Sequence, residues 1–290
     1  MKQCGFIAII GRPNVGKSTL LNSILKTKLS ITASKVQTTR DNIIGIDTQK
    51  TCQYIYMDTP GIHLGKTKTF NQILNRTALS VVKDVDCVLL LIQANKITNE
   101  DKKIIDHMTE HKINIPVLLV LTKIDLIKDK NVLLLQISKL DKLFNFSQII
   151  PLSAKKNISI DLLKNQIQPF LPKIDFIYNN DELTDKSTNF LCAEIVREQL
   201  TKQLDQELPY QLVVEIEKII EENNMVKISA VILVEKTHHK AIIIGKNGSK
   251  LKQIATNSRQ SLEKFFDKKV FLKTWVKLKT NIFEETFKNR

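Results

Sequence analysis

The sequence predicts two domains of different classes, an α/β domain with a mostly parallel sheet followed by a smaller α+β domain. Residues 5–172 alternate between short apolar runs and longer amphipathic stretches. Such alternation is typical of a parallel sheet wrapped by helices. After residue 189 the pattern changes to a helix, two alternating strands, a glycine turn between helices and a last strand. The 290 residues are too many for one ordinary domain and enough for two.

In the first domain, short apolar runs have the length of buried strands, and amphipathic stretches have the length of helices. The expected strands are Phe6–Ile10, Tyr54–Met57, Cys87–Ile92, Val117–Leu121 and Ile149–Leu152. The expected helices are Lys17–Leu25, Asn71–Val82, Thr98–His111, Val132–Leu143 and Ile158–Leu171. This domain is predicted to cover residues 1–172, and the polar, aperiodic residues 173–189 are predicted to form a linker.

The second domain is predicted to cover residues 190–290. Its expected helices are Phe190–Leu204, Ala241–Ile244 and Ser249–Phe266. Its expected strands are Tyr210–Ile216, Ile228–Val234 and Val270–Leu278, each with the alternation of a half-buried strand.

The composition is that of a globular protein, with 42% hydrophobic and 26% charged residues. No apolar run approaches the ~20 residues of a membrane-spanning helix, and the N-terminus lacks the pattern of a signal peptide. The four cysteines lie far apart without a CxxC pair. We therefore expect reduced, mostly buried thiols and a cytoplasmic protein.

The net charge of +14 is concentrated near the C-terminus. Residues 236–279 contain twelve Lys or Arg against two acidic residues, a net of +10. A clustered basic excess favours a polyanionic partner, either nucleic acid or an anionic membrane surface. The same charge also fits an ordinary solvated, lysine-rich surface.

A phosphate-binding loop is predicted where the strand Phe6–Ile10 runs through GRPNVGKS (Gly11–Ser18) into a helix. Backbone N–H groups and the helix N-terminus cradle phosphates in such a loop. Lys17 is expected to reach the β- and γ-phosphates, and the Ser18 hydroxyl to bind Mg²⁺. The predicted nucleotide contacts here are Gly11, Arg12, Pro13, Asn14, Val15, Gly16, Lys17, Ser18 and Thr19.

Two segments between residues 35 and 62 have the properties of nucleotide-sensing switches. Asp58-Thr-Pro-Gly61 follows a strand and fits the DxxG motif, in which Asp58 holds Mg²⁺ through water and the Gly61 amide meets the γ-phosphate. A threonine of the preceding KVQTTRDN segment should bind Mg²⁺; we favour Thr39, and Thr38 stays open. Ile62 replaces the glutamine that often orients the attacking water, so slow intrinsic hydrolysis is expected.

Two further motifs favour guanine over adenine. Thr122-Lys-Ile-Asp125 follows the strand Val117–Leu121, and the Asp125 carboxylate can accept two hydrogen bonds from guanine while the Lys123 stem packs along the ring. Ser153-Ala-Lys155 follows the strand Ile149–Leu152 and places the Ala154 amide near guanine O6. The phosphate loop and the DxxG, TKID and SAK motifs each follow a predicted strand, as expected at the C-terminal edge of a parallel sheet. The sequence therefore predicts a GTPase.

An RNA clamp is predicted at Gly245-Lys-Asn-Gly248, between two expected helices. A GxxG turn in this setting lets the backbone approach about four nucleotides. The predicted RNA contacts are Gly245, Lys246, Asn247, Gly248, Lys250 and Lys252, with Arg259 extending the positive surface. Apolar residues such as Ile228, Ile243 and Ile254 are expected in the core or groove. Trp275 is either a stacking platform or part of the core or groove wall.

His107-Met-Thr-Glu-His111 matches a zinc-peptidase pattern. Because the segment lies on a helix of a domain whose motifs are already explained, we interpret it as a solvated helix face.

These motifs together resemble the Era family of translation-associated GTPases over essentially the whole chain. The segments that carry the resemblance are GRPNVGKST, QTTRD, DTPGIH, TKID, SAK, ELPY at 207–210 and IIIGKNGSKLKQI at 242–254. The resemblance implies a Ras-like P-loop G domain followed by a type II KH domain. It also implies binding to the 3′ end of small-subunit (16S) ribosomal RNA and a role in maturation of the small ribosomal subunit.

The resemblance adds further expectations for the site. The catalytic residues would be Lys17, Thr39 and Gly61, and the Mg²⁺ ligands Ser18, Thr39 and Asp58. Asn14 would help to hold a K⁺ ion near the phosphates. Thr122 departs from the asparagine usual in the family and is expected to make fewer contacts to the loop and base.

Three functions remain to be compared. The first is a monomeric GTPase whose GTP state gates RNA engagement. The second is an RNA-binding chaperone with negligible GTP turnover. The third places the basic C-terminus on an anionic membrane, as a peripheral contact at the cytoplasmic face of the inner membrane.

Overall fold

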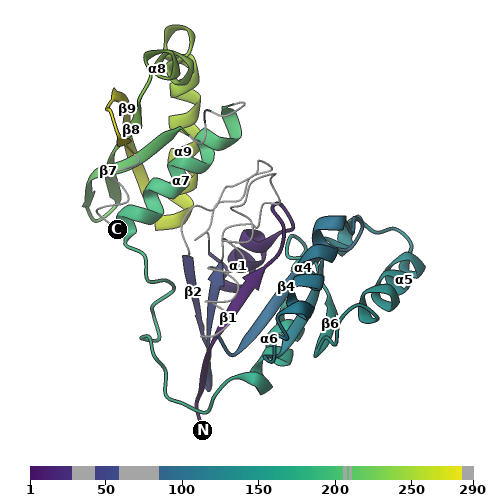
Figure 1. Cartoon of the computed structure of the whole chain (residues 1–290). Helices are drawn as coiled ribbons and strands as arrows, with labels where there is room; N and C mark the ends of the chain where they lie inside the picture. Colours follow the sequence, from purple (N-terminus) through teal and green to yellow (C-terminus); the bar gives the residue numbers. More distant parts are fainter. Residues whose placement is uncertain (28–42, 59–84, 205–207, 209–210, 283–290) are drawn as a thin grey trace. The chain divides into compact units, whose positions relative to one another are not determined.

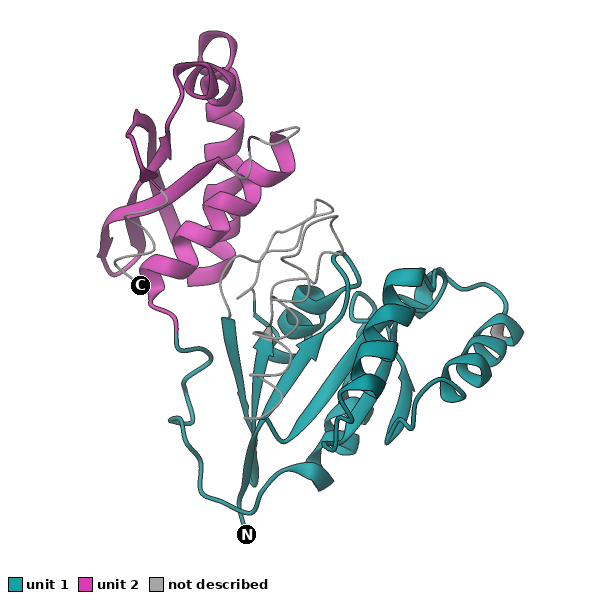
Figure 2. Cartoon of the chain, in the orientation of Figure 1, with its two compact units in different colours: residues 1–30, 39–185 teal, residues 31–38, 186–290 magenta. Residues whose placement is uncertain are grey.

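The computed structural model describes residues 1–27, 43–58, 85–204, 208 and 211–282, without the side chains of Asp58 and Lys130. The chain divides into two compact units, residues 1–30 with 39–185 and residues 31–38 with 186–290 (Figure 2). The expected helix Asn71–Val82 lies outside the described residues. So do Thr38, Thr39, Gly61 and Ile62.

The first unit contains a six-stranded sheet in the order β2-β3-β1-β4-β5-β6 (Figure 1). The strands are β1 Gln3–Ile10, β2 Ile43–Thr48, β3 Cys52–Asp58, β4 Cys87–Gln93, β5 Val117–Thr122 and β6 Gln148–Pro151. Every neighbouring pair is parallel except β2–β3. The predicted mostly parallel sheet is confirmed.

The described helices of this unit follow the strands in the expected alternation. They are α1 Lys17–Leu25, α4 Asn99–Glu110, α5 Lys130–Asp141 and α6 Ile160–Ile167, with 3₁₀ turns at Ile124–Leu126 and Gln168–Phe170. The N-terminus of α4 carries a capping box between Thr98 and Asp101, which satisfies backbone N–H groups that a helix start leaves free.

The sheet interior explains why the apolar runs become strands. All six residues of β5 are buried, and so are the first six of β4, as expected for strands covered on both faces. The four cysteines are buried and free. Burial raises the pKa of each thiol, to about 12 for Cys87, so all four stay protonated at neutral pH.

Strand β2 was not among the predicted elements. It is short and carries Gly45 near its centre, and glycine weakens a strand signal. The structure explains the glycine, because a Cβ at Gly45 would lie 2.5 Å from Cδ1 of Leu21 on α1. The helix therefore packs closely on this strand only because the side chain is absent.

Residues 173–185, which we call the strap, are bound to the first unit through Gln53. The Gln53 side chain is fully buried. Its oxygen accepts hydrogen bonds from the backbone amides of Ile177 and Tyr178, each at 3.0 Å. Its nitrogen donates to the Tyr178 carbonyl and the Thr48 hydroxyl, each at 2.9 Å. Part of the segment predicted as a linker is thus anchored, while the domain boundaries themselves stay a prediction.

A second anchor of the strap is a backbone hydrogen bond from the Ile46 amide on β2 to the Leu183 carbonyl, at 2.9 Å. This bond occupies a donor of an edge strand that would otherwise be open for pairing.

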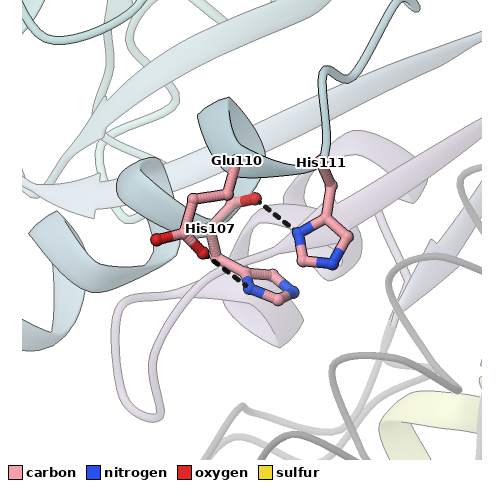
Figure 3. Close-up of side chains that lie close together, drawn as sticks. All are labelled: His107, Glu110 and His111. Carbon is pink, nitrogen blue, oxygen red and sulfur yellow. Dashed lines mark hydrogen bonds and ion pairs between the residues drawn. The ribbon is translucent and has the colours of Figure 1, made fainter.

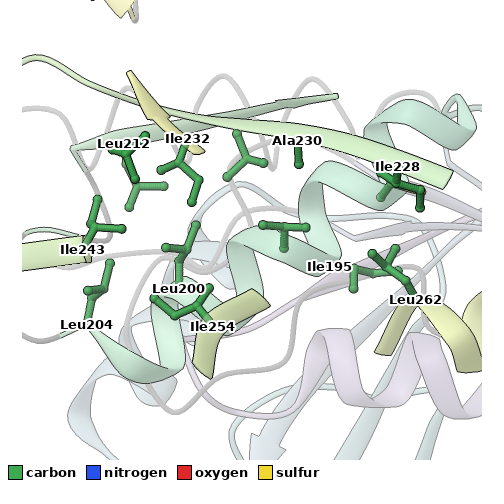
Figure 4. Packing of buried hydrophobic residues seen from close by; sticks show 14 of the residues in the cluster. Ile195, Leu200, Leu204, Leu212, Ile228, Ala230, Ile232, Ile243, Ile254 and Leu262 are labelled. Atoms are coloured by element: carbon green, nitrogen blue, oxygen red, sulfur yellow. The ribbon is translucent and has the colours of Figure 1, made fainter. Parts of the chain in front are cut away.

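The second unit has a three-stranded sheet in the order β7-β8-β9, with β7–β8 antiparallel and β8–β9 parallel. Its elements are α7 Thr188–Gln203, β7 Leu212–Glu221, β8 Met225–Val234, α8 Thr237–Ile244, a 3₁₀ turn Lys246–Gly248, α9 Ser249–Phe266 and β9 Lys269–Leu278. The core between the helices and one sheet face contains Ile228, Ile243 and Ile254 (Figure 4). These three isoleucines are therefore core residues.

Among the helices that the structure describes, none is long and apolar enough to cross a membrane.

We predict that Gln53→Ala lowers the free energy of unfolding by about 1–3 kcal/mol, because it leaves partly buried amide and carbonyl groups of the strap without their partner. Urea denaturation would measure the loss, and limited proteolysis should show faster cleavage within residues 173–185. The matched control is Gln49→Ala, whose side chain bonds only at the surface; a change there should stay within about 0.5 kcal/mol. Equal effects of the two variants would contradict an anchoring role for Gln53.

Candidate functional site

The loop from Gly11 to Gly16 turns sharply between β1 and α1. Gly11 has φ 149°, and a Cβ there would lie 2.6 Å from the Leu91 carbonyl oxygen on β4. Gly16 has φ 115° and is the N-cap of α1. Both positions therefore require glycine. The first turn of α1 contains no acidic residue that would repel an anion, and the positive end of a helix dipole favours one there.

The Lys17 side chain lies across this loop. It is buried, and its Nζ donates to the carbonyls of Gly11 at 2.9 Å and Arg12 at 3.2 Å. The ammonium group is therefore held at the mouth of the loop, where phosphate oxygens would accept the same protons. Ser18 and Thr19 follow on the first turn of α1.

The Arg12 side chain is held away from this mouth. Its Nε lies 3.1 Å from both carboxylate oxygens of Asp101, and Nη2 donates to the Lys96 carbonyl at 3.0 Å. Asp101 is buried and also caps α4. Arg12 thus fixes the loop to the start of α4.

Thr122 and Lys123 connect the end of β5 to the same loop. The buried Thr122 hydroxyl donates to the Val15 carbonyl at 2.7 Å. The Lys123 Nζ donates to the Asn14 carbonyl at 2.7 Å. Burial, with Arg12 nearby, lowers the pKa of Lys123. We expected Thr122 to make fewer contacts than asparagine, and the structure shows that it keeps a direct bond to the loop.

A pocket of about 300 Å³ lies beside these residues, with the properties of a base site. Its lining consists of Gly16, Thr19, Thr122, Lys123, Asp125, Leu126, Ser153, Ala154 and Lys155. The Ser153 hydroxyl donates to a carboxylate oxygen of Asp125 at 2.5 Å, which fixes the exposed carboxylate toward the pocket. Sequence reasoning missed Leu126, whose side chain is 55% exposed at the pocket; its position next to the TKID motif is the signal that could have identified it.

The predicted nucleotide motifs meet at one edge of the sheet. Asp58 ends β3 and pairs in register with Ile9 of β1, two residues before Gly11. The structure thus brings together the phosphate loop, the Asp58 main chain and the base pocket. Thr39 and Gly61 lie outside the described residues, and the roles of individual site residues stay predictions.

The GxxG turn of the second unit has a strained backbone open to a ligand. Gly245 and Gly248 have φ values of 70° and 75°, and the intervening Asn247 has φ 52°. A Cβ at Gly245 would lie 2.7 Å from the Lys250 Cβ, whereas one at Gly248 would meet no described atom within 4 Å. Gly248 is therefore fixed by its backbone conformation, and its face can accept another chain.

The basic residues near this turn differ in exposure and in whether a carboxylate pairs with them. Lys246 and Lys252 are exposed and Lys250 is half-buried, so three cations surround the start of α9. Arg259, expected to extend the positive surface, instead donates to Glu263 at 2.7 Å. Its charge is offset by that carboxylate.

The cluster His107, Glu110 and His111 lies at the C-terminal end of α4 (Figure 3). Their potential ligand atoms lie within 4.8 Å of one another. The His111 Nδ1 pairs with the His107 carbonyl at 2.9 Å, and the His107 Nδ1 lies 3.9 Å from Glu110. A helix end leaves carbonyls free for such side chains, which accounts for the His111 contact. The interpretation as a solvated helix face stays a prediction.

Known proteins share both halves of this arrangement. Residues 6–123 match the 50S ribosome-binding GTPase family and residues 207–282 match the KH domain family. A GTPase Era of Coxiella burnetii is 46% identical over 277 residues, covering 96% of this chain and 93% of the relative. The chain belongs to the GTPase Era family. Its predicted P-loop GTPase and KH domains, and its classification as a GTPase, are thereby confirmed.

Other Era proteins agree over similar lengths. GTPase Era of Nitrosomonas eutropha is 44% identical and covers 96% of this chain and 93% of its own. A crystal structure of Era in complex with MgGDPNP and nucleotides 1506–1542 of 16S ribosomal RNA superposes with a TM-score of 0.86 at 34% identity, covering 97% of this chain and 95% of that one. An Aquifex aeolicus Era variant bound to GDP and AlF4⁻ gives 0.85 at 35% identity, with 96% and 95% covered.

We predict that Thr122→Val weakens GDP and GTP binding by roughly 5- to 100-fold, because the buried Val15 carbonyl loses its hydrogen bond and the loop loses its link to β5. Thr122→Ser keeps the hydroxyl and should bind nearly as the unchanged protein does. Titration with a fluorescent GDP analogue measures both. If Val and Ser bind alike, the hydroxyl does not position the loop.

We predict that Asp125→Asn lowers affinity for GTP by roughly 100-fold or more, because two charge-assisted hydrogen bonds to guanine are lost. An amide offers one donor and one acceptor, so it complements xanthine, which carries an oxygen in place of the exocyclic amine. Competition between GTP and XTP for the variant checks both effects. Unchanged preference for GTP would show that another residue reads the base.

Proposed function

We propose that this GTPase binds the 3′ end of small-subunit (16S) ribosomal RNA and assists maturation of the small ribosomal subunit, with its GTP state controlling RNA engagement. The observation that carries the proposal is the joining, on one chain, of a guanine-nucleotide pocket and a GxxG turn. The similar Era structure with MgGDPNP and 16S RNA nucleotides supports it over 97% of this chain.

In this proposal the first unit holds GTP and Mg²⁺ at the C-terminal edge of its sheet. The residues from Gly11 to Thr19 surround the phosphates, and Lys17 gives up its loop carbonyls for the β- and γ-phosphate oxygens. Ser18, Asp58 and Thr39 would hold Mg²⁺. The main chains of Ser18 and Asp58 end up at the same sheet edge, which fits a shared ion. Magnesium neutralises charge that develops on the transferred phosphoryl group.

Hydrolysis is proposed to be slow without a partner. Lys17, Thr39 and the Gly61 amide would stabilise the γ-phosphate, but Ile62 has no group that could orient water, so intrinsic turnover should fall below the ~1–100 s⁻¹ typical of kinases. Asn14 would contribute to a K⁺ site beside the phosphates. Its backbone, at φ 61°, is already held by Lys123.

The second unit is proposed to bind single-stranded RNA at its GxxG turn. Gly245 and Gly248 permit close approach, Asn247 lies between them, and Lys246, Lys250 and Lys252 supply charge to phosphates. We further propose a monomer in the cytoplasm that makes peripheral contact with an anionic membrane at the inner face. The basic excess of residues 236–279 supports a polyanionic partner of either kind.

A second candidate function is an RNA-binding chaperone with negligible GTP turnover. The absence of a water-orienting side chain at Ile62 favours slow turnover in both cases. Phosphate release measured with and without RNA separates the two, since a switch should hydrolyse GTP above background in at least one condition.

We predict that an RNA of the small-subunit 3′ end binds more tightly when the protein carries a non-hydrolysable GTP analogue than when it carries GDP. Gly245→Asp and Gly248→Asp should remove the binding in both states, because each adds a carboxylate and a Cβ where φ favours glycine. Fluorescence anisotropy measures RNA binding by the unchanged protein and by each variant in both nucleotide states. Equal binding with GDP and the analogue would argue against gating, and RNA binding that survives both changes would argue against the clamp.

A further inference from the structure

The sheet of the second unit has an outer face, opposite the one that packs against α7, α8 and α9, and near Trp275 this outer face is covered by Ile282. Residues 270 and 276 of β9 belong to the core under α7 and α9, and Leu272 packs against it. Their neighbours therefore point to the opposite, outer face. Along that face β9 reads lysine, phenylalanine, lysine, tryptophan, lysine at Lys269, Phe271, Lys273, Trp275 and Lys277.

Phe271 is the centre of an exposed patch on this face. Its side chain is 58% exposed. It pairs in register with Lys227 on β8, which pairs in turn with Ile220 on β7. Lys269 and Lys273 lie two residues to either side, ~6.6 Å away along the strand. The whole set, which we call the outer-face patch, is Phe271, Ile220, Met225, Lys218, Lys227, Lys269 and Lys273.

The lysines of the outer-face patch are only partly offset by acidic groups. Lys227 forms an ion pair with Glu222 at 2.5 Å. Among the described residues, no carboxylate lies within salt-bridge distance of Lys218, Lys269 or Lys273. The Lys273 Nζ lies 5.8 Å from the centre of the Trp275 ring. Lys269 and Lys273 thus flank the exposed ring of Phe271.

We propose that the outer-face patch is a second RNA-binding surface, on which a base of a single-stranded segment stacks on Phe271 while Lys269 and Lys273 bind the flanking phosphates. Aromatic rings interleaved with cations at this spacing bind single strands by stacking and charge together. Phe271 lies on the sheet in line with Lys269 and Lys273. This arrangement favours a single-stranded RNA that runs along β9 over insertion of the ring into a lipid layer. The inference rests on the proposed RNA binding of the same unit.

The test compares two single-stranded RNAs from the small-subunit 3′ end. One has about six nucleotides, enough for the four-nucleotide clamp of a GxxG turn, and the other is about three times longer. Phe271→Leu should weaken binding of the long RNA by roughly 5- to 100-fold and leave the short RNA unchanged. Phe271→Tyr keeps the ring and should retain binding. Thermal unfolding should be unaffected, because the side chain is exposed.

Charge gives an independent readout. Lys269→Gln with Lys273→Gln should lower the slope of log affinity against log salt for the long RNA by about 1.4. The matched control, Lys102→Gln with Lys103→Gln, removes the same charge from exposed positions of α4 and should leave the slope unchanged.

The outcomes separate this surface from the clamp. An unchanged affinity for the long RNA in both patch variants would overturn the proposal, and so would equal losses for both RNAs. A loss of sedimentation with phosphatidylglycerol vesicles, with RNA binding intact, would assign the patch to a membrane instead. Gly248→Asp tests the proposed function separately, since it should abolish binding of the short RNA whatever the patch does.

Discussion

The hydroxyl of Thr122 joins the two ends of the nucleotide site through its bond to the Val15 carbonyl. One end is the phosphate loop, and the other is the pocket that Thr122 itself helps to line. A nucleotide has a fixed length, so both ends can be occupied together only if their separation is set in advance. Lys123 reinforces this spacing through the Asn14 carbonyl.

The loop is also held from its other side, by Arg12 against Asp101. Because Asp101 caps α4 as well, one carboxylate orders both a helix start and the phosphate loop. Gly11 allows the loop to approach β4 closely. Contacts from α4, β4 and β5 therefore restrain the six-residue loop from Gly11 to Gly16. Little conformational freedom is left for a ligand to remove on binding.

Most of the first unit could be predicted because buried parallel strands appear in the sequence as short apolar runs, as in Val117–Leu121. The nucleotide motifs then follow directly after those runs. What could not be predicted depends on partners distant in sequence. Strand β2 was missed because of Gly45, and glycine is needed there because Leu21 on α1 packs against it. The partner of Arg12 is 89 residues away, and local patterns contain no information on such pairs. The Arg259–Glu263 pair, four residues apart on a helix, could have been anticipated.

The strap is synthesised after all the strands of the first unit, so its contacts with Gln53 and β2 can form only late in translation. Gln53 is synthesised early, yet the Tyr178 carbonyl that its amide binds is 125 residues further along the chain. At ~5–20 residues per second, that partner is made roughly 6–25 s after the glutamine. Until then the Gln53 amide has Thr48 as a partner but lacks Ile177 and Tyr178, and the edge strand β2 lacks the Leu183 carbonyl. The β2–β3 edge of the nascent sheet therefore stays open to mispairing until the strap is made.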